Sequence, residues 1–240
     1  MVSTRNHPSN FPPPDAALTP SKALTKTNAT RPRTSRPGSW THTPSALTLT
    51  WLIISLPLVI WDMIYVFGRP YTMAGGSLSS PIYTPYILYG QVDRLYGIEA
   101  WEEHNGFTAA QTALNLIETV GYLGYLYIAY VHGEGERFGR RTLAGGWGGL
   151  ACLLGFTVAV MTVSKTLLYE LNDVFSGFRH TGHNDSLRLI FLYMIPNNLW
   201  LIIPSILVFV FGREILHGLA IASGDESSKP ARAASPTKEE

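Results

Sequence analysis

Residues 189–211 read LIFLYMIPNNLWLIIPSILVFVF, a stretch of 23 residues that contains no Asp, Glu, Lys or Arg. A helix of that length is long enough to cross the roughly 30 Å hydrocarbon core of a bilayer. Two adjacent asparagines, Asn197 and Asn198, nevertheless lie near its middle. The stretch therefore predicts a membrane-spanning helix that carries polar groups inside the membrane.

Three further stretches of 22, 25 and 27 residues are similarly apolar: 46–67, 107–131 and 143–169. Of the chain's 18 basic and 17 acidic residues, only Asp62, Glu118 and Lys165 lie in the four stretches. We predict an all-α integral membrane protein, a bundle of four or five transmembrane helices. The distribution excludes a soluble domain of amphipathic helices. The net charge of +1 excludes nucleic-acid binding by a basic surface.

The sequence predicts a transmembrane domain over 46–217 between two disordered polar tails, 1–45 and 218–240. The first tail holds eight of the sixteen prolines and a single acidic residue, Asp15, and such a composition cannot bury enough apolar surface to fold. Basic residues in this tail and in the 132–142 loop place both tails in the cytosol by the positive-inside rule. The Arg- and Ser-rich start also fits a mitochondrial transit peptide, although its prolines oppose the amphipathic helix that such a peptide needs.

Polar residues recur on one face of the predicted 107–131 helix. They are spaced 4, 3, 4 and 3 residues apart, which is a helical repeat: Gln111, Asn115, Glu118, Tyr122 and Tyr125. Hydrogen bonds between helices explain the amides and phenols. They explain Glu118 less well, because an ionisable group inside a span costs roughly 2.5–3.5 kcal/mol on insertion scales. We therefore interpret Glu118 as a functional acid.

The first span has a matching stripe that includes Asp62 and Tyr65. Asp62 lies near the end of its span, so an interfacial ion pair with Arg69 is an alternative to a functional role. In the third span, Lys165 also lies near an end, and we expect its side chain to snorkel to the interface.

The last span adds Tyr193, Asn197 and Trp200 at helical spacing, with Asn198 as an alternative to Asn197. Together the inward stripes predict a cavity that contains carboxyl groups, amides and aromatic rings. A carboxyl group there can hold a proton at neutral pH and transfer it, because burial disfavours its charged form. Trp200 and the tyrosines could stabilise a carbocation through their ring faces, and the Asn197 carbonyl through its dipole. This set favours proton-driven rearrangement of an apolar polycycle.

Three other features have simpler interpretations. The 68–106 segment is rich in tyrosine, and we interpret it as an anchor at the membrane interface rather than as a lid over the cavity. His180 and His183 lack a third ligand nearby, so no metal site is predicted. Cys152, the single cysteine, is interpreted as a packing residue.

In its order of motifs the chain resembles the EXPERA-domain membrane proteins, and among them the emopamil-binding protein family of sterol Δ8–Δ7 isomerases. Four elements carry the resemblance, which covers roughly residues 46–211: Trp61-Asp62 followed by Tyr65, Tyr89-Gly90-x-x-Asp93-x-x-Tyr96, the mid-span acid Glu118, and Asn197-Asn198-Leu199-Trp200 with Pro204.

The resemblance implies a four- or five-helix bundle in the endoplasmic reticulum membrane, a homodimer, a sterol or terpenoid substrate, and no metal or organic cofactor. It implies Glu118 as the acid/base, Asn197 as its polar partner and Trp200 as the cation-stabilising ring, with Asp62 as a further acid. Substrate contacts are expected from the remaining polar candidates: Gln111, Asn115, Tyr122, Tyr65, Tyr193 and Asp93.

Two departures from the family pattern keep alternatives open. The family has a His and a Glu four residues apart on the first span, whereas this chain has no His there and reads Trp61-Asp62-Met63-Ile64-Tyr65. In the second span, Asn115 rather than Glu118 could align with the family's acid. The alternatives to an isomerase are a sterol- or lipid-binding protein of the same fold and a small membrane terpene cyclase.

Overall fold

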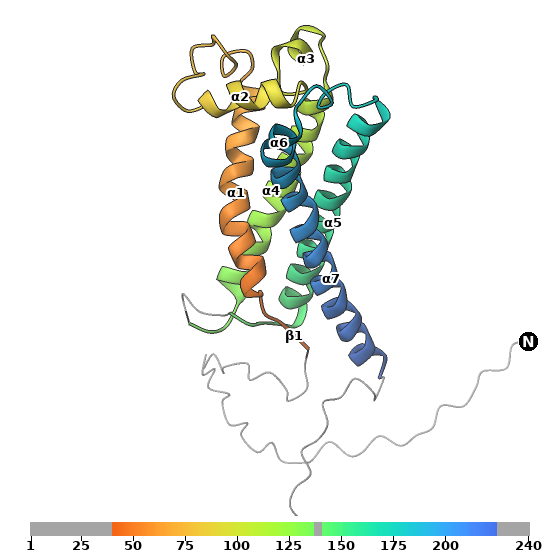
Figure 1. Cartoon of the computed structure of the whole chain (residues 1–240). Helices are drawn as coiled ribbons and strands as arrows, with labels where there is room; N and C mark the ends of the chain where they lie inside the picture. Colours follow the sequence, from red (N-terminus) through yellow and green to blue (C-terminus); the bar gives the residue numbers. More distant parts are fainter. Residues whose placement is uncertain (1–39, 137–140, 225–240) are drawn as a thin grey trace, which may run out of the picture. The chain divides into compact units, whose positions relative to one another are not determined.

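A computed structural model describes residues 40–136 and 141–224 of the 240-residue chain (Figure 1). These residues are mostly helical. The long helical segments are α1 (Ala46–Phe67), α4 (Phe107–His132), α5 (Gly145–Phe175) and a continuous run over Ser186–Ser223. This last run consists of α6 (Ser186–Arg188), the π-helix η1 (Leu189–Met194) and α7 (Ile195–Ser223).

Three of these segments are long and apolar enough to cross a membrane: α1, α5 and the Ser186–Ser223 run. They indicate a multi-pass membrane protein and confirm three of the four predicted spans. Helix α4 has 26 residues, so it is about 39 Å long and would also reach across a bilayer. It is not among the three, because polar residues such as Gln111, Asn115 and Glu118 lower its hydropathy.

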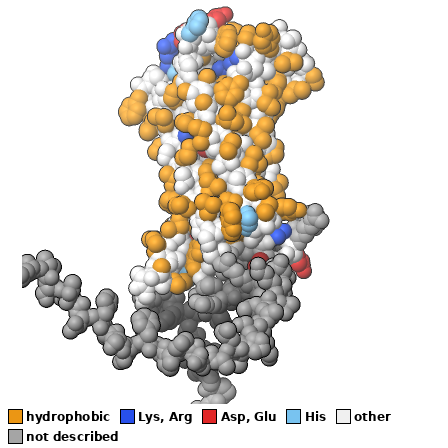
Figure 2. Space-filling model, turned by 180° about the vertical axis from the view of Figure 1, so that it is seen from behind, with side chains coloured by type: hydrophobic (Ala, Val, Ile, Leu, Met, Phe, Trp, Pro, Cys, Tyr) orange, Lys and Arg blue, Asp and Glu red, His pale blue; other side chains and the backbone are white. Residues whose placement is uncertain are grey.

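Large apolar side chains cover the outside of the long helices. Ile53 on α1 is 71% exposed, and Val120 on α4 and Phe209 on α7 are each 63% exposed. In Figure 2, apolar side chains spread along the length of the helices, and charged side chains gather mostly towards the two ends. An apolar surface this extensive suits contact with lipid rather than water.

Inside the bundle, α4 packs against α1 and α5, and α5 packs against α7. Close approach depends on small residues at two of these contacts. A Cβ atom on Gly155 of α5 would lie 2.6 Å from the ring of Phe211 on α7. A Cβ atom on Gly121 of α4 would lie 2.5 Å from a methyl group of Val158 on α5. Glycine at these positions allows the helices to approach closely, as is common between membrane helices.

The two ends of the bundle are closed by different structures. At one end, strand β1 (Thr41–His42) pairs antiparallel with strand β2 (Leu143–Ala144) and so ties the chain before α1 to the start of α5. At the other end, the 68–106 segment forms α2 (Thr84–Val92) and α3 (Ile98–Glu102) (Figure 1).

The ordered domain extends past both predicted boundaries, 46 and 217. Strand β1 lies within the predicted first tail, because it finds a hydrogen-bonding partner in β2. Helix α7 continues to Ser223 and ends at Gly224, whose φ of 78° favours glycine. Most of the two tails, residues 1–39 and 225–240, lies outside the described residues, so their disorder stays a prediction.

Candidate functional site

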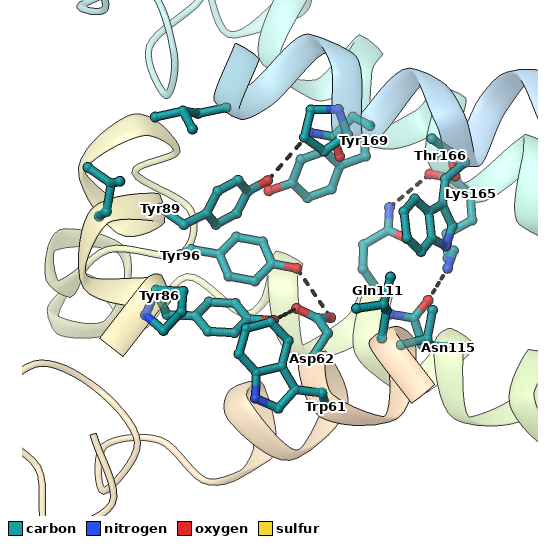
Figure 3. A pocket seen from close by; sticks show the side chains of 18 residues that line it. Trp61, Asp62, Tyr86, Tyr89, Tyr96, Gln111, Asn115, Lys165, Thr166 and Tyr169 are labelled. Atoms are coloured by element: carbon teal, nitrogen blue, oxygen red, sulfur yellow. Dashed lines mark hydrogen bonds between the residues drawn. The ribbon is translucent and has the colours of Figure 1, made fainter. Parts of the chain in front are cut away.

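A cavity of about 500 Å³ lies between α1, α2, α4, α5 and the η1–α7 run, and Figure 3 shows its wall. This volume is in the range of sites that hold small organic ligands. Five predicted site residues line it: Asp62, Gln111, Asn115, Asn197 and Trp200. The other lining residues are Leu58, Val59, Trp61, Pro85, Tyr86, Leu88, Tyr89, Tyr96, Lys165, Thr166, Tyr169, Leu192 and Pro196.

Asp62 contributes the carboxyl group of this wall. The Tyr86 hydroxyl donates to its Oδ1 at 2.8 Å, and the Tyr96 hydroxyl donates to its Oδ2 at 3.4 Å (Figure 3). Burial raises the pKa of Tyr86 and of Tyr96, so both stay protonated and act as donors. Both carboxyl oxygens of Asp62 therefore face phenol donors from the 68–106 segment.

Arg69 takes a different position from the interfacial pair considered for Asp62. Its guanidinium carbon lies 5.2 Å from the ring centre of Tyr65 and 5.4 Å from that of Tyr96. These are cation–π distances. Arg69 therefore packs on the rings of Tyr65 and Tyr96, while phenols supply the hydrogen bonds to Asp62.

The expected snorkelling of Lys165 is wrong. Its Nζ lies 3.2 Å from Oε2 of Glu118 and donates to Oδ1 of Asn115, and its side chain is only 11% exposed. Nε2 of Gln111 donates to the Lys165 backbone carbonyl at 3.2 Å. The lysine stays inside because α4 offers it two acceptors one helical turn apart.

Glu118 lies outside the wall of the main cavity. It borders a second cavity of about 20 Å³ together with Tyr122 and Thr162. The Thr162 hydroxyl donates to its Oε2 at 2.9 Å. Its other oxygen, Oε1, is buried and has no hydrogen-bond partner among the described residues. Glu118 therefore connects to the main cavity through Lys165.

Asn197 and Trp200 occupy adjacent turns of α7 on the cavity side. Nδ2 of Asn197 donates to the Tyr193 carbonyl at 2.8 Å and to the Tyr89 hydroxyl at 3.4 Å. Asn198 is not in the wall, and its Nδ2 donates to the Met194 carbonyl. Of the two asparagines, Asn197 is therefore the one that lines the cavity. Trp200 borders both cavities.

Four predicted contact residues do not line the main cavity: Tyr65, Tyr122, Tyr193 and Asp93. Tyr65 stacks behind Tyr86 with ring centres 3.7 Å apart, and Tyr122 borders the small cavity. Tyr193 is buried in a cluster with Tyr169. Tyr65 and Tyr193 therefore support lining tyrosines from behind, because a helical stripe is wider than the part of it that faces one cavity.

Asp93 supports the wall through one tyrosine. The Tyr169 hydroxyl donates to its Oδ2, and the Leu95 amide donates to its Oδ1 at 3.0 Å. Burial raises the pKa of Asp93 to about 7, and its hydrogen bonds only partly offset that effect. Because Tyr169 is also a lining residue, Asp93 fixes the position of a ring in the cavity.

Sequence reasoning missed two groups of lining residues. Lys165, Thr166 and Tyr169 follow one another at helical spacing on α5, a polar stripe that could have been recognised together with Thr162. Tyr86, Tyr89 and Tyr96 were noted as part of a tyrosine-rich segment, but that segment was interpreted as an interfacial anchor, so its rings were not assigned to the cavity. Their place in the wall favours the lid interpretation of the 68–106 segment over the anchor.

Comparison with known proteins gives no family assignment. Neither a protein-family model nor a curated protein matches this chain.

Proposed function

We propose that the chain is an intramembrane acid/base isomerase that shifts a double bond in a sterol or a related polycyclic terpenoid. The observation that carries this proposal is the carboxyl group of Asp62 in the wall of a cavity of about 500 Å³ within a bundle of apolar helices. Aromatic and aliphatic side chains form most of that wall, which suits a rigid apolar ligand.

The proposed reaction needs a proton donor and a proton acceptor. Asp62 in its protonated form adds a proton to one alkene carbon, so the π bond breaks and a carbocation forms at the neighbouring carbon. Loss of a proton from the next carbon forms the new double bond, so no proton is consumed overall. The Lys165 ammonium passes one proton to Glu118, whose Oε2 lies 3.2 Å from Nζ, and the resulting amine takes the proton that the carbocation loses. Exchange with solvent then returns a proton to Asp62 and removes one from Glu118.

The carbocation needs stabilisation that water cannot provide in this site. Trp200 and Tyr89 line the cavity, and aromatic ring faces attract cations most strongly where water is excluded. The Asn197 side chain adds a dipole beside them. Trp200, Tyr89 and Asn197 are therefore the residues that stabilise the carbocation in this proposal.

The resemblance to the emopamil-binding protein family supports the same reaction and its setting. We propose α4 as the fourth span, since it packs between α1 and α5 and is long enough to cross a bilayer. The proposed location is the endoplasmic reticulum membrane, with both termini in the cytosol. The protein is proposed to work as a homodimer, and the proposed reaction needs no cofactor.

A second candidate function is binding of the same ligand without turnover. It is favoured by the hydrogen bonds that already occupy both oxygens of Asp62 and one oxygen of Glu118. Both oxygens of Asp62 accept from phenols, and Oε2 of Glu118 contacts Lys165 and Thr162. A site built only to hold a ligand would satisfy its polar groups in this way.

The test is conversion of a Δ8-sterol by microsomes that contain the protein, in deuterated water, followed by mass spectrometry. We expect a Δ7 product that carries solvent deuterium, loss of conversion in Asp62→Asn, and a large reduction in Glu118→Gln. The matched control is Glu99→Gln, an exposed carboxyl in the 68–106 segment, which should convert normally.

Binding of a radiolabelled sterol separates the two candidate functions. Saturable binding without conversion, retained in Asp62→Asn, would replace the isomerase by the binding protein. If the protein shows neither saturable binding nor conversion, both candidate functions are overturned.

The orientation is tested with a membrane-impermeant maleimide on sealed microsomes. Ser80→Cys and Glu136→Cys place exposed thiols in the segments before and after α4, and the native Cys152 is buried. We expect labelling of Glu136→Cys alone. The reverse pattern would invert the proposed topology, and labelling of both would mean that α4 does not cross the membrane.

A further inference from the structure

Three metal-ligating side chains from distant parts of the chain meet at the strand-paired end of the bundle. His42 lies on β1, Cys152 on α5 and Glu214 on α7, and one ligand atom of each lies within 4.8 Å of the other two. None of the three lines the Asp62 cavity or the small cavity beside Glu118. This cluster therefore has no part in the proposed isomerase site.

Two of the three ligand–ligand distances in the cluster are close to those of a metal centre, and the third, between His42 and Cys152, is within 4.8 Å. Cys152 Sγ lies 3.8 Å from Glu214 Oε2, and His42 Nδ1 lies 2.5 Å from the same oxygen. Ligands about 2.0–2.3 Å from a tetrahedral zinc ion are roughly 3.3–3.6 Å apart. The Cys–Glu pair needs almost no movement, and the His–Glu pair must open by about 1 Å.

The surroundings orient the histidine for coordination through Nδ1. Its other nitrogen, Nε2, lies 3.0 Å from the Tyr125 hydroxyl. When Nε2–H donates to that oxygen, Nδ1 carries the lone pair that a metal ion needs. The Glu214 backbone is also held, because the Trp40 indole donates to its carbonyl at 3.1 Å.

Burial and charge also suit a metal ion. His42 and Cys152 are almost completely buried, whereas the Glu214 side chain is 31% exposed, which leaves one side open to an arriving ion and to a water ligand. A thiolate and a carboxylate neutralise a divalent cation, and the imidazole is neutral. Binding displaces one proton from the thiol and one from the histidine–glutamate pair into solvent.

We propose that His42 Nδ1, Cys152 Sγ and Glu214 Oε2 bind one zinc ion, with water as the fourth ligand. A mixed nitrogen, sulfur and oxygen set is typical of zinc rather than of the hard cations calcium and magnesium. The ion joins β1 to α5 and α7, so it clamps the chain that precedes α1 onto the bundle. The proposal does not depend on the isomerase function.

Cobalt(II) in place of zinc gives the sharpest test, because thiolate–cobalt coordination produces a charge-transfer absorption in the near ultraviolet. The full chain is purified in detergent with an affinity tag that contains no histidine, treated with a chelator, and titrated with Co²⁺ and then Zn²⁺. Since Cys152 is the only cysteine, that band in the wild-type chain identifies this residue as a ligand without any variant.

We expect one Co²⁺ per chain, displacement of the band by Zn²⁺, and a higher thermal transition in the presence of Zn²⁺. Cys152→Ser should lose the band completely, and Glu214→Gln should bind at least ten-fold more weakly. The matched control is His217→Gln, which changes an exposed histidine one turn after Glu214 and should behave as the wild type does.

Absence of a thiolate–cobalt band in the folded wild-type chain would overturn the proposal. So would Zn²⁺ binding that Cys152→Ser retains with unchanged affinity. In either case the cluster would be a partly buried hydrogen-bonded pair, His42 and Glu214, with Cys152 packed beside it.

Discussion

The two halves of the bundle use aromatic residues in opposite ways. Around Phe211 and Tyr125, rings fill the space between helices, and Gly155 lets α5 and α7 approach until little space remains. Around Asp62, the rings of Tyr86 and Tyr96 come from the 68–106 segment and line a cavity of about 500 Å³. Aromatic content alone therefore does not mark a binding site, and the origin of the rings decides whether they fill the space or enclose it.

Trp200 lies at the border between the two halves. It lines the large cavity and the small one, and its ring packs edge-on against Trp51 at 5.2 Å. The ion pair between Glu118, which borders the small cavity, and Lys165, which lines the large cavity, lies at the same border. The comparison thus predicts that substitutions in the packed half affect mainly stability, that those in the open half affect mainly ligand binding, and that those at the border affect stability as well as the proposed reaction.

The largest effect is expected from Glu118→Ala at the border. It leaves the Lys165 ammonium buried without its carboxylate, which costs about 3–5 kcal/mol of the free energy of unfolding. The measurement is a denaturation titration in detergent, with Glu99→Ala as the control for loss of an exposed carboxyl. Unchanged stability would show that Lys165 does not need Glu118 and that the border is more open than the structure indicates.

The next effect is a pH dependence that originates beside the open half. Burial raises the pKa of Asp93 from 3.8 to about 7, so the folded chain holds this proton more tightly than the unfolded chain does. The stabilisation of the folded chain by this bound proton is complete below pH 3.8, and it is lost as the pH rises towards 7. Between pH 5 and pH 8 the free energy of unfolding should fall by roughly 2–3 kcal/mol.

Asp93→Asn keeps an acceptor for the Leu95 amide but cannot ionise. Its thermal transition should therefore change less between pH 5 and pH 8 than that of the wild type. The Glu99→Gln chain serves as the reference for general pH effects. Equal slopes in the wild type and Asp93→Asn would mean that Asp93 does not titrate in this range.

A smaller effect is expected in the packed half from Gly155→Ala, because the new methyl group would lie 2.6 Å from the Phe211 ring. Overpacking of this kind costs about 1–3 kcal/mol. Gly149→Ala on the same helix is the matched control, since nothing lies within 4 Å of its added Cβ. The control should be stabilised by about 0.5–1 kcal/mol. Stabilisation of both variants would contradict tight packing between α5 and α7.

The smallest expected effect compares the two neighbouring asparagines of α7. Asn197 lines the cavity, and Asn198 does not, although each donates to a backbone carbonyl one turn earlier. Asn197→Ala should weaken binding of a radiolabelled sterol about five- to ten-fold, the value of one hydrogen bond. Asn198→Ala should leave the affinity unchanged. Equal affinities in the two variants would place the ligand away from α7.

Much of the fold could be predicted from the four long stretches that contain almost no charged residues. The four apolar stretches became helices because a long apolar run has few other stable conformations. The site was predicted less completely. Gln111 and Glu118 share one face of α4 but lie two turns, or about 10 Å, apart along its axis. Periodicity assigned both to one cavity, whereas the cavity ends near Asn115.

Contacts between distant segments were the hardest part to predict. Lys165 was interpreted as a snorkelling residue, because its acceptors Asn115 and Glu118 belong to another helix. Likewise, nothing local relates His42 to Glu214, which is 172 residues further along the chain. Such pairs depend on how helices are arranged, and a single sequence states only how each helix is patterned.

The π-helix η1 has a consequence for how this cavity can change. A π-helical turn accommodates one residue more than an α-helical turn, so deletion of one residue in Leu189–Met194 would allow a regular α-helix through this region. Residues on either side of η1 would keep their faces, because the wider turn already accommodates the extra residue. The change would be local to η1, which contributes Leu192 to the wall, and Asn197 would stay in place. A single codon in η1 could therefore reshape one side of the cavity without altering the rest of the bundle.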